Sequence, residues 1–398
     1  MCVAIGLGGI VLLYLALRVA FSPVPATWNR AAASPITRFE GPSAVVNGKL
    51  YTFAGFTEQR RDDHVLVATN QVHVYDPGTD RWTRCADMPV AITHLNPAVD
   101  GTAIWFAGGF EGNHPGPASN AVWKYDTVTD QWSAGPSLPA ARGGGGLVRV
   151  GRTLHYISGY FGALQEPSSP DHWALALDGD RRSWEKRAPL PVSRGHFGVV
   201  AQGEKIYIVG GSLTHHPNTR DTARVDVYNA RNDTWTAVSS LPFPRSHFEP
   251  GTFLFGDRIF IVGGRDDQSR TLSEMELADI TAYDIATDTW REVGVLPYRI
   301  RAPVAQVVGD RLIVTGGSTF WAQEPRAETF AVSCSDDAGS FCSPAGWRGV
   351  RLQMLSSLKS ALKSIARITP WRLQIPLGLE RIANPPDRSN RVAPPSDN

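Results

Sequence analysis

The feature that most constrains this fold is a unit of about fifty residues that recurs along the chain. Its clearest copy runs from Arg194 to Trp235, where three short stretches alternate apolar and polar residues and are separated by turns. A fourth stretch follows Trp235 and ends at Leu241-Pro242, which suits an edge strand. The unit therefore predicts a four-stranded antiparallel meander. Such a meander cannot bury its faces alone, so copies of it must pack together.

Two sequence signals show that the unit is repeated six times. A glycine ends the second expected strand of every copy, at spacings of 54, 50, 52, 53 and 53 residues: Gly55, Gly109, Gly159, Gly211, Gly264 and Gly317. In four copies a tyrosine precedes a tryptophan by seven residues: Tyr75 and Trp82, Tyr125 and Trp132, Tyr228 and Trp235, Tyr283 and Trp290. Trp184 marks a degenerate copy, in which Leu177-Asp178 replaces Tyr-Asp.

This combination of period, Gly-Gly signature and tryptophan resembles the kelch repeat, and six copies resemble a six-bladed kelch β-propeller. The resemblance covers residues 26–334 and implies an all-β fold. A chain of 398 residues with 42% hydrophobic content can fill such a ring as one domain. The net charge of +1 gives no global argument for a nucleic-acid partner, and we expect a monomer.

The first and last copies predict how the ring closes. Ten residues separate Trp28 from Arg38, and the same interval follows Trp132, Trp184 and Trp235. Trp28 thus has the position of an outer-strand tryptophan without inner strands before it. The last copy has middle strands near Gly317 and 329–332 but no tryptophan at the usual distance. We therefore expect residues 27–33 to pair with residues 329–332, although Trp347 competes for the same place.

The ends of the chain differ in character from the repeats. Residues 1–22 hold an apolar run, Val3 to Leu17, which fits either a signal anchor or a cleaved signal peptide. After a linker at 335–349, residues 350–368 form an expected amphipathic helix with a basic face, and 369–398 a proline-rich tail. That helix fits an anionic membrane surface or a docking position on the propeller equally well.

Localisation rests on two signals that oppose each other. Cys334 and Cys342 are eight residues apart and could close a disulfide loop, which would imply an oxidising compartment; two free thiols are the alternative. Basic residues follow the apolar run and none precedes it, which favours a cytoplasmic propeller. Because large domains translocate largely regardless of flanking charge, we expect a membrane-anchored, extracytoplasmic protein at the periplasmic side or the cell surface.

Arginine and histidine recur where successive blades of a propeller connect. The ten-residue interval places in these connections Arg38, Ile92, Arg142, Arg194, Arg245 and Ile300, with Arg299 and Arg301 beside the last. Two residues later lie Glu40, His94, Gly144, His196, His247 and Ala302. Guanidinium groups that share a cavity need negative charge to offset their repulsion, so this pattern predicts an anion site. The predicted ligand-binding residues are Arg38, His94, Arg142, Arg194, His196, Arg245 and Arg301.

The resemblance adds a ligand class to this anion site. In kelch domains, the mouth with arginine in a Pro-x-x-Arg sequence binds acidic peptides or sugar acids. That implication applies to Arg38, Arg142, Arg194 and Arg245, and the spacing slips at Arg299 and Arg301. The structural alternative is that arginines of this set pair with Asp or Glu of a neighbouring blade and hold the ring together; Glu40 and Glu249 are candidate partners.

Enzymes with this fold supply the second functional hypothesis. The copper site of the galactose-oxidase type needs a Tyr-His pair, and kelch specifier proteins need a Glu-x-x-x-Asp-x-x-x-His motif; this sequence has neither. We therefore predict no metal and no cofactor. The nearest enzymatic analogue is the bacterial sialic-acid mutarotase. If this chain is an enzyme of that kind, its Glu249 and His247 would be the catalytic acid and base. A non-enzymatic binding module for an anionic small molecule or acidic peptide is the preferred interpretation.

Overall fold

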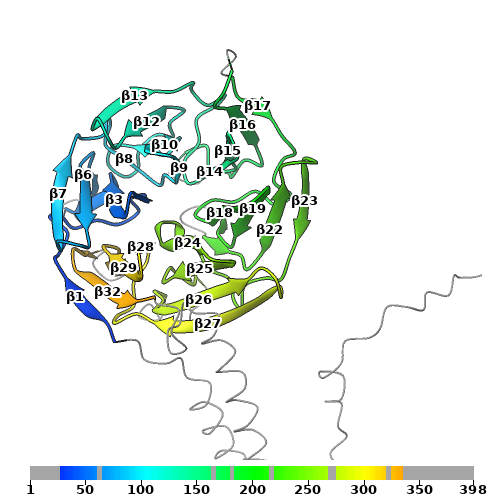
Figure 1. The fold of residues 1–398 in the computed structure, drawn as a ribbon. Helices are drawn as coiled ribbons and strands as arrows, with labels where there is room; N and C mark the ends of the chain where they lie inside the picture. The colour runs from blue at the N-terminus through cyan, green and yellow to red at the C-terminus, as the bar shows by residue number, and fades with distance from the viewer. Residues whose placement is uncertain are drawn as a thin grey trace, which may run out of the picture. The chain divides into compact units, whose positions relative to one another are not determined.

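The fold is a ring of six antiparallel sheets with four strands each (Figure 1). It is seen in a computed structural model that describes residues 27–60, 65–162, 167–179, 183–214, 219–267, 275–319 and 324–334. Within these ranges the predicted all-β six-bladed propeller is confirmed, and the only helix is the single 3-10 turn η1 (Glu249–Gly251).

The first three blades each begin with their innermost strand. The first blade contains β2 (Ser43–Val46), β3 (Lys49–Phe53), β6 (Val72–Asp76) and β7 (Arg81–Cys85). The second contains β9 (Pro97–Asp100), β10 (Ala103–Ala107), β12 (Val122–Asp126) and β13 (Gln131–Ala134). The third contains β14 (Gly146–Val150), β15 (Thr153–Ile157), β16 (His172–Ala176) and the two-residue β17 (Glu185–Lys186).

The remaining blades follow the same order, except that the sixth borrows its outer strand. The fourth contains β18 (Gly198–Gln202), β19 (Lys205–Val209), β22 (Val225–Asn229) and β23 (Thr234–Ala237). The fifth contains β24 (Thr252–Phe255), β25 (Arg258–Val262), β26 (Asp279–Asp284) and β27 (Thr289–Val295). The sixth contains β28 (Val304–Val308), β29 (Arg311–Thr315), β32 (Thr329–Ser333) and β1 (Asn29–Ala31).

The N-terminal strand closes the ring as the sequence predicts. Strand β1 pairs antiparallel with β32, with Arg30 opposite Phe330, and Figure 1 shows the two strands side by side. The Trp28 indole donates to the carbonyl of Val295 in the fifth blade at 2.9 Å. Trp28 therefore takes the outer-strand place in the sixth blade. The competing Trp347 lies outside the described residues.

Two repeated hydrogen bonds connect each blade to the next. The indole N–H of each outer tryptophan donates to a carbonyl of the preceding blade or its connection, as Trp82 does to Ala32 and Trp235 to Ala188, both at 2.8 Å. On the inner side, the N–H of each second signature glycine donates to the carbonyl that the ten-residue interval identifies. Gly211 donates to Arg245 at 2.9 Å, for example, and Gly317 closes the circle on Arg38 at 2.7 Å. The residue ten positions after each tryptophan is therefore the one whose carbonyl makes the backbone contact between neighbouring blades.

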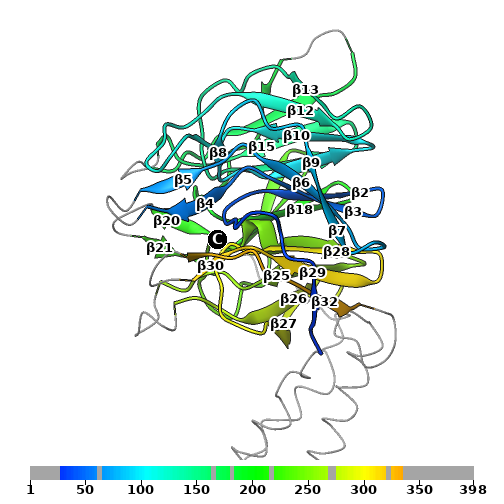
Figure 2. The same ribbon diagram turned by 90° about the vertical axis from the view of Figure 1, so that its left-hand side faces the viewer.

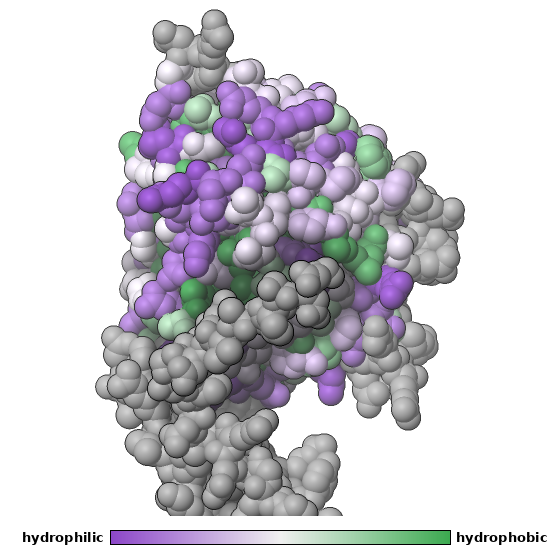
Figure 3. Space-filling model, turned by 90° about the vertical axis from the view of Figure 1, so that its right-hand side faces the viewer, coloured by the Kyte–Doolittle hydropathy of each residue, from purple (hydrophilic) through white to green (hydrophobic). Residues whose placement is uncertain are grey.

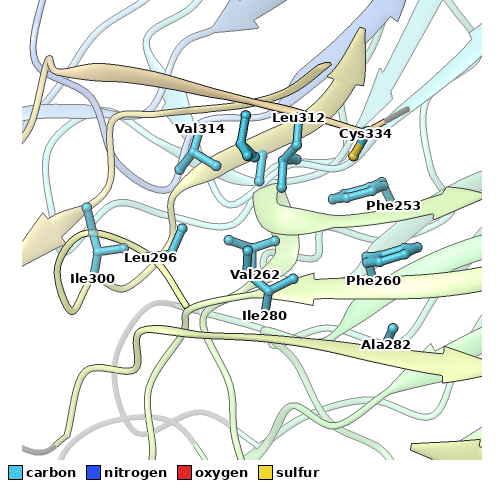
Figure 4. Packing of buried hydrophobic residues seen from close by; sticks show 12 residues of the cluster. Phe253, Phe260, Val262, Ile280, Ala282, Leu296, Ile300, Leu312, Val314 and Cys334 are labelled. Carbon is cyan, nitrogen blue, oxygen red and sulfur yellow. The ribbon is translucent and has the colours of Figure 1, made fainter. Parts of the chain in front are cut away.

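Apolar side chains fill the spaces between neighbouring blades. Figure 4 shows this packing between the fifth and sixth blades, where Phe253, Phe260 and Val262 face Leu312 and Val314. All five side chains are buried, and each contributes roughly 1.5–3 kcal/mol of transfer free energy. The outer strands are more polar, and the face visible in Figure 3 is mainly hydrophilic with scattered apolar residues.

Short two-stranded pairings after the Gly-Gly signatures form a second layer on one face. Three are hairpins: β4 (Phe56–Gln59) with β5 (Leu66–Ala68), β20 (Ser212–Thr214) with β21 (Arg220–Asp221), and β30 (Ser318–Thr319) with β31 (Glu324–Pro325). The fourth pairs β11 (Phe110–Glu111) with β8 (Ile92–Thr93) of the preceding blade connection. Figure 2 shows β4, β5, β20 and β21 on the same side of the ring. The blade connections with the predicted site lie at this face, which we call the hairpin face.

The predictions for the chain ends have mixed outcomes. Cys334 is disulfide-bonded, but its partner lies outside the described residues, so pairing with Cys342 stays a prediction. The N-terminal apolar run, the linker, the basic helix and the tail also lie outside them. In the part of the chain that the structure describes, no helix is long and apolar enough to span a bilayer.

Candidate functional site

Six residues, one at each blade connection, lie around the channel at the hairpin face, and we call them the inner ring. All have left-handed backbone conformations, with φ between 47° and 66°: Glu40, His94, Gly144, His196, His247 and Ala302. Backbone N–H groups join four of the six successive pairs, for example His94 to the Glu40 carbonyl at 3.1 Å and Ala302 to that of His247 at 2.7 Å. Residues other than glycine rarely adopt this backbone conformation, so the surrounding structure must hold the five non-glycine members in it against strain.

The inner ring brings together the histidines and the glutamate that the sequence placed two residues after the interval. His94 Nε2 lies 2.7 Å from Glu40 Oε2, and His247 Nε2 lies 3.9 Å from Glu40 Oε1. The rings of His196 and His247 stack at a centroid distance of 4.2 Å and an interplanar angle of 10°. The His94 ring contacts His196 edge-on at 4.8 Å. Four side chains thus form one contiguous buried cluster.

Burial and the charges of neighbouring groups shift the pKa values of these side chains in different directions. Burial alone would raise the pKa of Glu40, but the adjacent His94, with Arg301, holds it well below its usual range. Burial opposes the charged form of His94, yet Glu40 raises the pKa of that imidazole above its ordinary value. Burial and the charges of His196, Arg265 and Arg301 lower the pKa of His247 well below normal. Glu40 and His94 therefore form an ion pair beside a neutral His247.

Replacing Glu40 by glutamine should reverse the pKa shift of His94. The amide removes the negative charge while the burial that disfavours imidazolium remains, so the His94 pKa should fall below its usual value of about 6.5. Histidine-detected NMR titration of the variant and the parent chain measures this directly. A His94 pKa that stays raised in Glu40→Gln would show that another group carries the effect.

Glu249 lies just inside the inner ring because η1 turns the chain there. Its Oε1 is 2.9 Å from His196 Nδ1, whereas Oε2 is buried and has no hydrogen-bond partner in the structure. Burial raises the pKa of Glu249 to about 8. Beside it, a cavity of about 10 Å³ is bounded by Glu40, His94 and Asn96, which is room for about one water. Glu249 contacts the Nδ1 edge of the His196 ring, and His247 stacks on the face of that ring.

The four Pro-x-x-Arg arginines turn into their own blades instead of converging on the mouth. Arg142 binds Asp171, Arg194 binds Asp226 and Arg245 binds Asp279, with separations of 2.5, 2.9 and 2.6 Å. Arg38 donates to the backbone carbonyls of Ala54 and Gln71 and approaches the His73 ring. Burial lowers the pKa of Arg38 to about 9. Three of the four arginines thus pair with acidic groups, as the structural alternative expected, but the partners are aspartates of the same blade and not of a neighbouring one.

Two other arginines lie at the mouth, over the inner ring. Arg301, which the sequence predicted, donates from Nε to Ser318 Oγ at 3.0 Å and is 5% exposed. Arg265, which sequence reasoning missed, is 9% exposed, and its Nε has no hydrogen-bond partner among the residues that the structure describes. Among the described residues, neither guanidinium forms an ion pair within 4 Å. Burial lowers the pKa of Arg301; the charge of Glu40 opposes this shift and that of Arg265 adds to it.

The position of Arg265 was recoverable from the repeat. The residue after each second signature glycine forms a backbone bridge with the connection of its blade, as Arg265 does with Ser246. These positions surround the mouth: Phe56, Phe110, Tyr160, Ser212, Arg265 and Ser318. Three consecutive blades supply aromatic rings and the next three supply polar groups. Arg265 is the single charged residue among these six equivalent positions, and that difference was the sequence signal that could have identified it.

Metal chemistry finds no support in the described ranges. No group of three or more His, Cys, Asp or Glu side chains there could hold a metal ion. The adjacent His215 and His216 lie outside them.

Comparison with known families identifies the repeat. A model described as the KLHDC2/KLHL20/DRC7 Kelch-repeats domain matches residues 99–317, and a Kelch motif model matches residues 38–89. The first of these covers more than half of the chain.

Individual relatives agree with the family models. Kelch repeat-containing protein At3g27220 of Arabidopsis thaliana is 25% identical over 322 residues, which cover 76% of this chain and 74% of the relative. Kelch-like protein terF of Aspergillus terreus is 28% identical over 325 residues, 78% of this chain and 69% of the relative. Kelch-like protein 36 of Rattus norvegicus is 26% identical, with 69% of this chain and 43% of the relative covered.

Among solved structures, YjhT matches with a TM-score of 0.54 and 16% identity over 64% of this chain and 84% of that one. This likeness shows the fold alone. Together with the repeat signature, the six closed sheets and the tryptophan contacts between blades, the family models show that this chain belongs to the Kelch-repeat family of β-propellers.

Proposed function

We propose that this Kelch-repeat propeller is a binding module that takes an anionic group at its hairpin face through Arg265 and Arg301. The carrying observation is a pair of buried guanidinium groups without an ion-pair partner in the described chain. The charges of Glu40 and Glu276 act on Arg301, but neither carboxylate lies within ion-pair distance of it. Burying a cation without a direct ion-pair partner costs several kcal/mol, so an incoming anion would be favoured. The charge of Arg265 acts on Arg301, and both act on His247, which indicates that the two cations share one region.

Carboxylate ligands suit this site better than neutral sugars. Guanidinium forks bind carboxylates through paired N–H donors, and charge-assisted hydrogen bonds are roughly twice as strong as neutral ones. The four blade arginines already bind aspartates or carbonyls, so the proposal does not use them. The ligand is thus an acidic peptide or a sugar acid.

The test is a thermal-shift panel with the full chain. Sialic acid, glucuronate and an oligoglutamate peptide form one arm, and glucose and an oligolysine peptide form the other. A ligand at a hundred times its Kd should stabilise the folded state by about 2.7 kcal/mol and raise Tm by several degrees. A panel in which no acidic compound raises Tm more than its neutral counterpart would contradict the proposal.

A sugar-acid mutarotase is the second candidate, favoured by the separated pKa values of Glu249 and His247. Near neutral pH Glu249 is protonated and His247 is neutral, which is the pairing of acid and base that anomerisation needs. NMR exchange spectroscopy of sialic acid measures anomer interconversion directly. Catalysis that is absent from Glu249→Gln would favour the enzyme; a rate no faster than in buffer would exclude it.

We also propose export with attachment to the membrane through the N-terminal apolar run. The disulfide-bonded state of Cys334 supports an oxidising compartment. Protease treatment of intact spheroplasts tests the topology. A propeller that is digested agrees with export, whereas one that stays protected would place it in the cytoplasm.

A further inference from the structure

The central channel holds a cavity that opens away from the hairpin face and that the anion proposal does not use. Its volume is about 260 Å³, and the innermost strands of all six blades contribute to its lining. At the ring end it is bounded by Glu249, Asn96 and Leu95, the residues that also line the one-water cavity under the inner ring. Val45 and Leu254, further along their strands, are partly exposed. The channel is therefore a blind cavity with Glu249 at its closed end.

The walls of the cavity combine apolar and polar groups. Val45, Val99, Val148, Val199 and Leu254 line the sides, together with the polar side chains of Ser43, Thr252 and Gln306. A space of this size suits a small organic molecule and lies below the range typical of drug-sized ligands. The valine-lined part of the wall suits an alkyl chain, and the carboxyl group at the closed end suits a charged or hydrogen-bonding head.

One carboxyl oxygen of Glu249 lacks a hydrogen-bond partner among the described residues at that end. Its side chain is 9% exposed, Oε1 is taken by His196, and Oε2 has no hydrogen-bond partner in the structure. The charged groups that act on it besides His196 are His94 and Glu40, which are paired with each other and have opposite effects. A buried carboxylate oxygen in this state gains most from a cationic hydrogen-bond donor.

We propose that the channel cavity is a binding site for a small alkylammonium, with the N–H groups on Glu249 Oε2 and the alkyl chain against the valine-lined wall. Binding is linked to proton release, because burial keeps Glu249 protonated near neutral pH, with a pKa of about 8, and the ligand needs the ionised form. The ionised fraction rises from about one tenth at pH 7 to about nine tenths at pH 9, so affinity should rise about tenfold. The ligand itself stays charged because alkylamines, like lysine, have pKa values above about 10.

The experiment is calorimetric titration of the full chain with n-butylammonium chloride, butan-1-ol and sodium butyrate at pH 7 and pH 9. We expect butylammonium to bind, with about tenfold higher affinity at pH 9, and the alcohol and the carboxylate to bind at least tenfold more weakly. Absence of butylammonium binding, equal affinity at the two pH values, or equal affinity for the alcohol would each overturn the proposal.

Two variants separate the charge from the cavity. Glu249→Gln keeps the shape and should abolish binding at both pH values, and Val99→Phe should fill the channel and abolish binding with Glu249 intact. Val128→Ser, at a turn residue that is 72% exposed, is the control and should bind like the parent chain. Near-UV circular dichroism establishes folding, and if Glu249→Gln does not fold, Val99→Phe and the pH series still decide. Parent-like binding by a folded Glu249→Gln or Val99→Phe would overturn the proposal.

Discussion

Replacing Asp226 by asparagine is expected to lower the free energy of unfolding by about 3–5 kcal/mol, because it leaves the Arg194 guanidinium buried without its counter-charge. Both side chains are 0% exposed, and their N–O separation is 2.9 Å. Arg194 would keep only hydrogen bonds to the carbonyls of Gly210, Val192 and Ile208. Urea denaturation measures the loss.

The matched control is Asp178→Asn, which removes the same charge at the surface. Asp178 pairs with Arg152 at 3.0 Å, but its side chain is 66% exposed. Exposed pairs contribute up to about 1 kcal/mol, so the control should change stability little. Equal effects of the two substitutions would show that Arg194 is not a buried brace of the fourth blade.

Removing strand β1 is expected to destabilise the ring at both of its neighbours. The strand supplies the outer edge of the sixth blade, and the residues beside it contact the first blade: Ala32 N–H donates to Asp80 at 2.8 Å and Trp82 donates to the Ala32 carbonyl. With the Trp28 bond to Val295, the loss should be on the order of 5 kcal/mol. The exposed edge of β32 should also promote aggregation.

Two truncated chains isolate this effect. One begins at Ala26 and keeps β1, and the other begins at Ser34 and lacks it; neither contains the apolar run. The shorter chain should unfold at lower denaturant concentration and form oligomers, and a synthetic peptide of residues 26–33 should restore part of its stability. Identical unfolding curves for the two chains would disprove closure by β1.

The fold could be predicted from the sequence because similar residues recur at nearly the same spacing in the six repeats and make equivalent contacts in each blade. The ten-residue interval from tryptophan identified the connection residues, whose carbonyls accept from the signature glycines in every blade. Trp28 kept that interval, so ring closure could be inferred from one displaced tryptophan. The ten-residue interval predicts where the backbone of each connection residue lies, and the structure has these residues at the predicted places.

The candidate site was less predictable because spacing does not determine where a side chain points. Arg142, Arg194 and Arg245 turn toward aspartates at or just before the third strand of each blade, and no pattern near the arginines reveals those partners. Glu249 was expected as an arginine partner or a catalytic group; it contacts His196 rather than an arginine, and its catalytic role stays a prediction. Arg265 lay in a repeat position that could have been compared across blades.

The most direct test of the binding proposal is calorimetry with an acidic ligand from the thermal-shift panel. Arg301→Gln and Arg265→Gln are compared with Arg231→Gln, which removes the same charge from a side chain that is 77% exposed and distant from the mouth. Loss of one charge-assisted contact, about 1.5–3 kcal/mol, predicts affinities weakened by roughly 10- to 150-fold in the two mouth variants and unchanged in the control. Unchanged affinity in both mouth variants, or equal weakening in all three, would contradict the account.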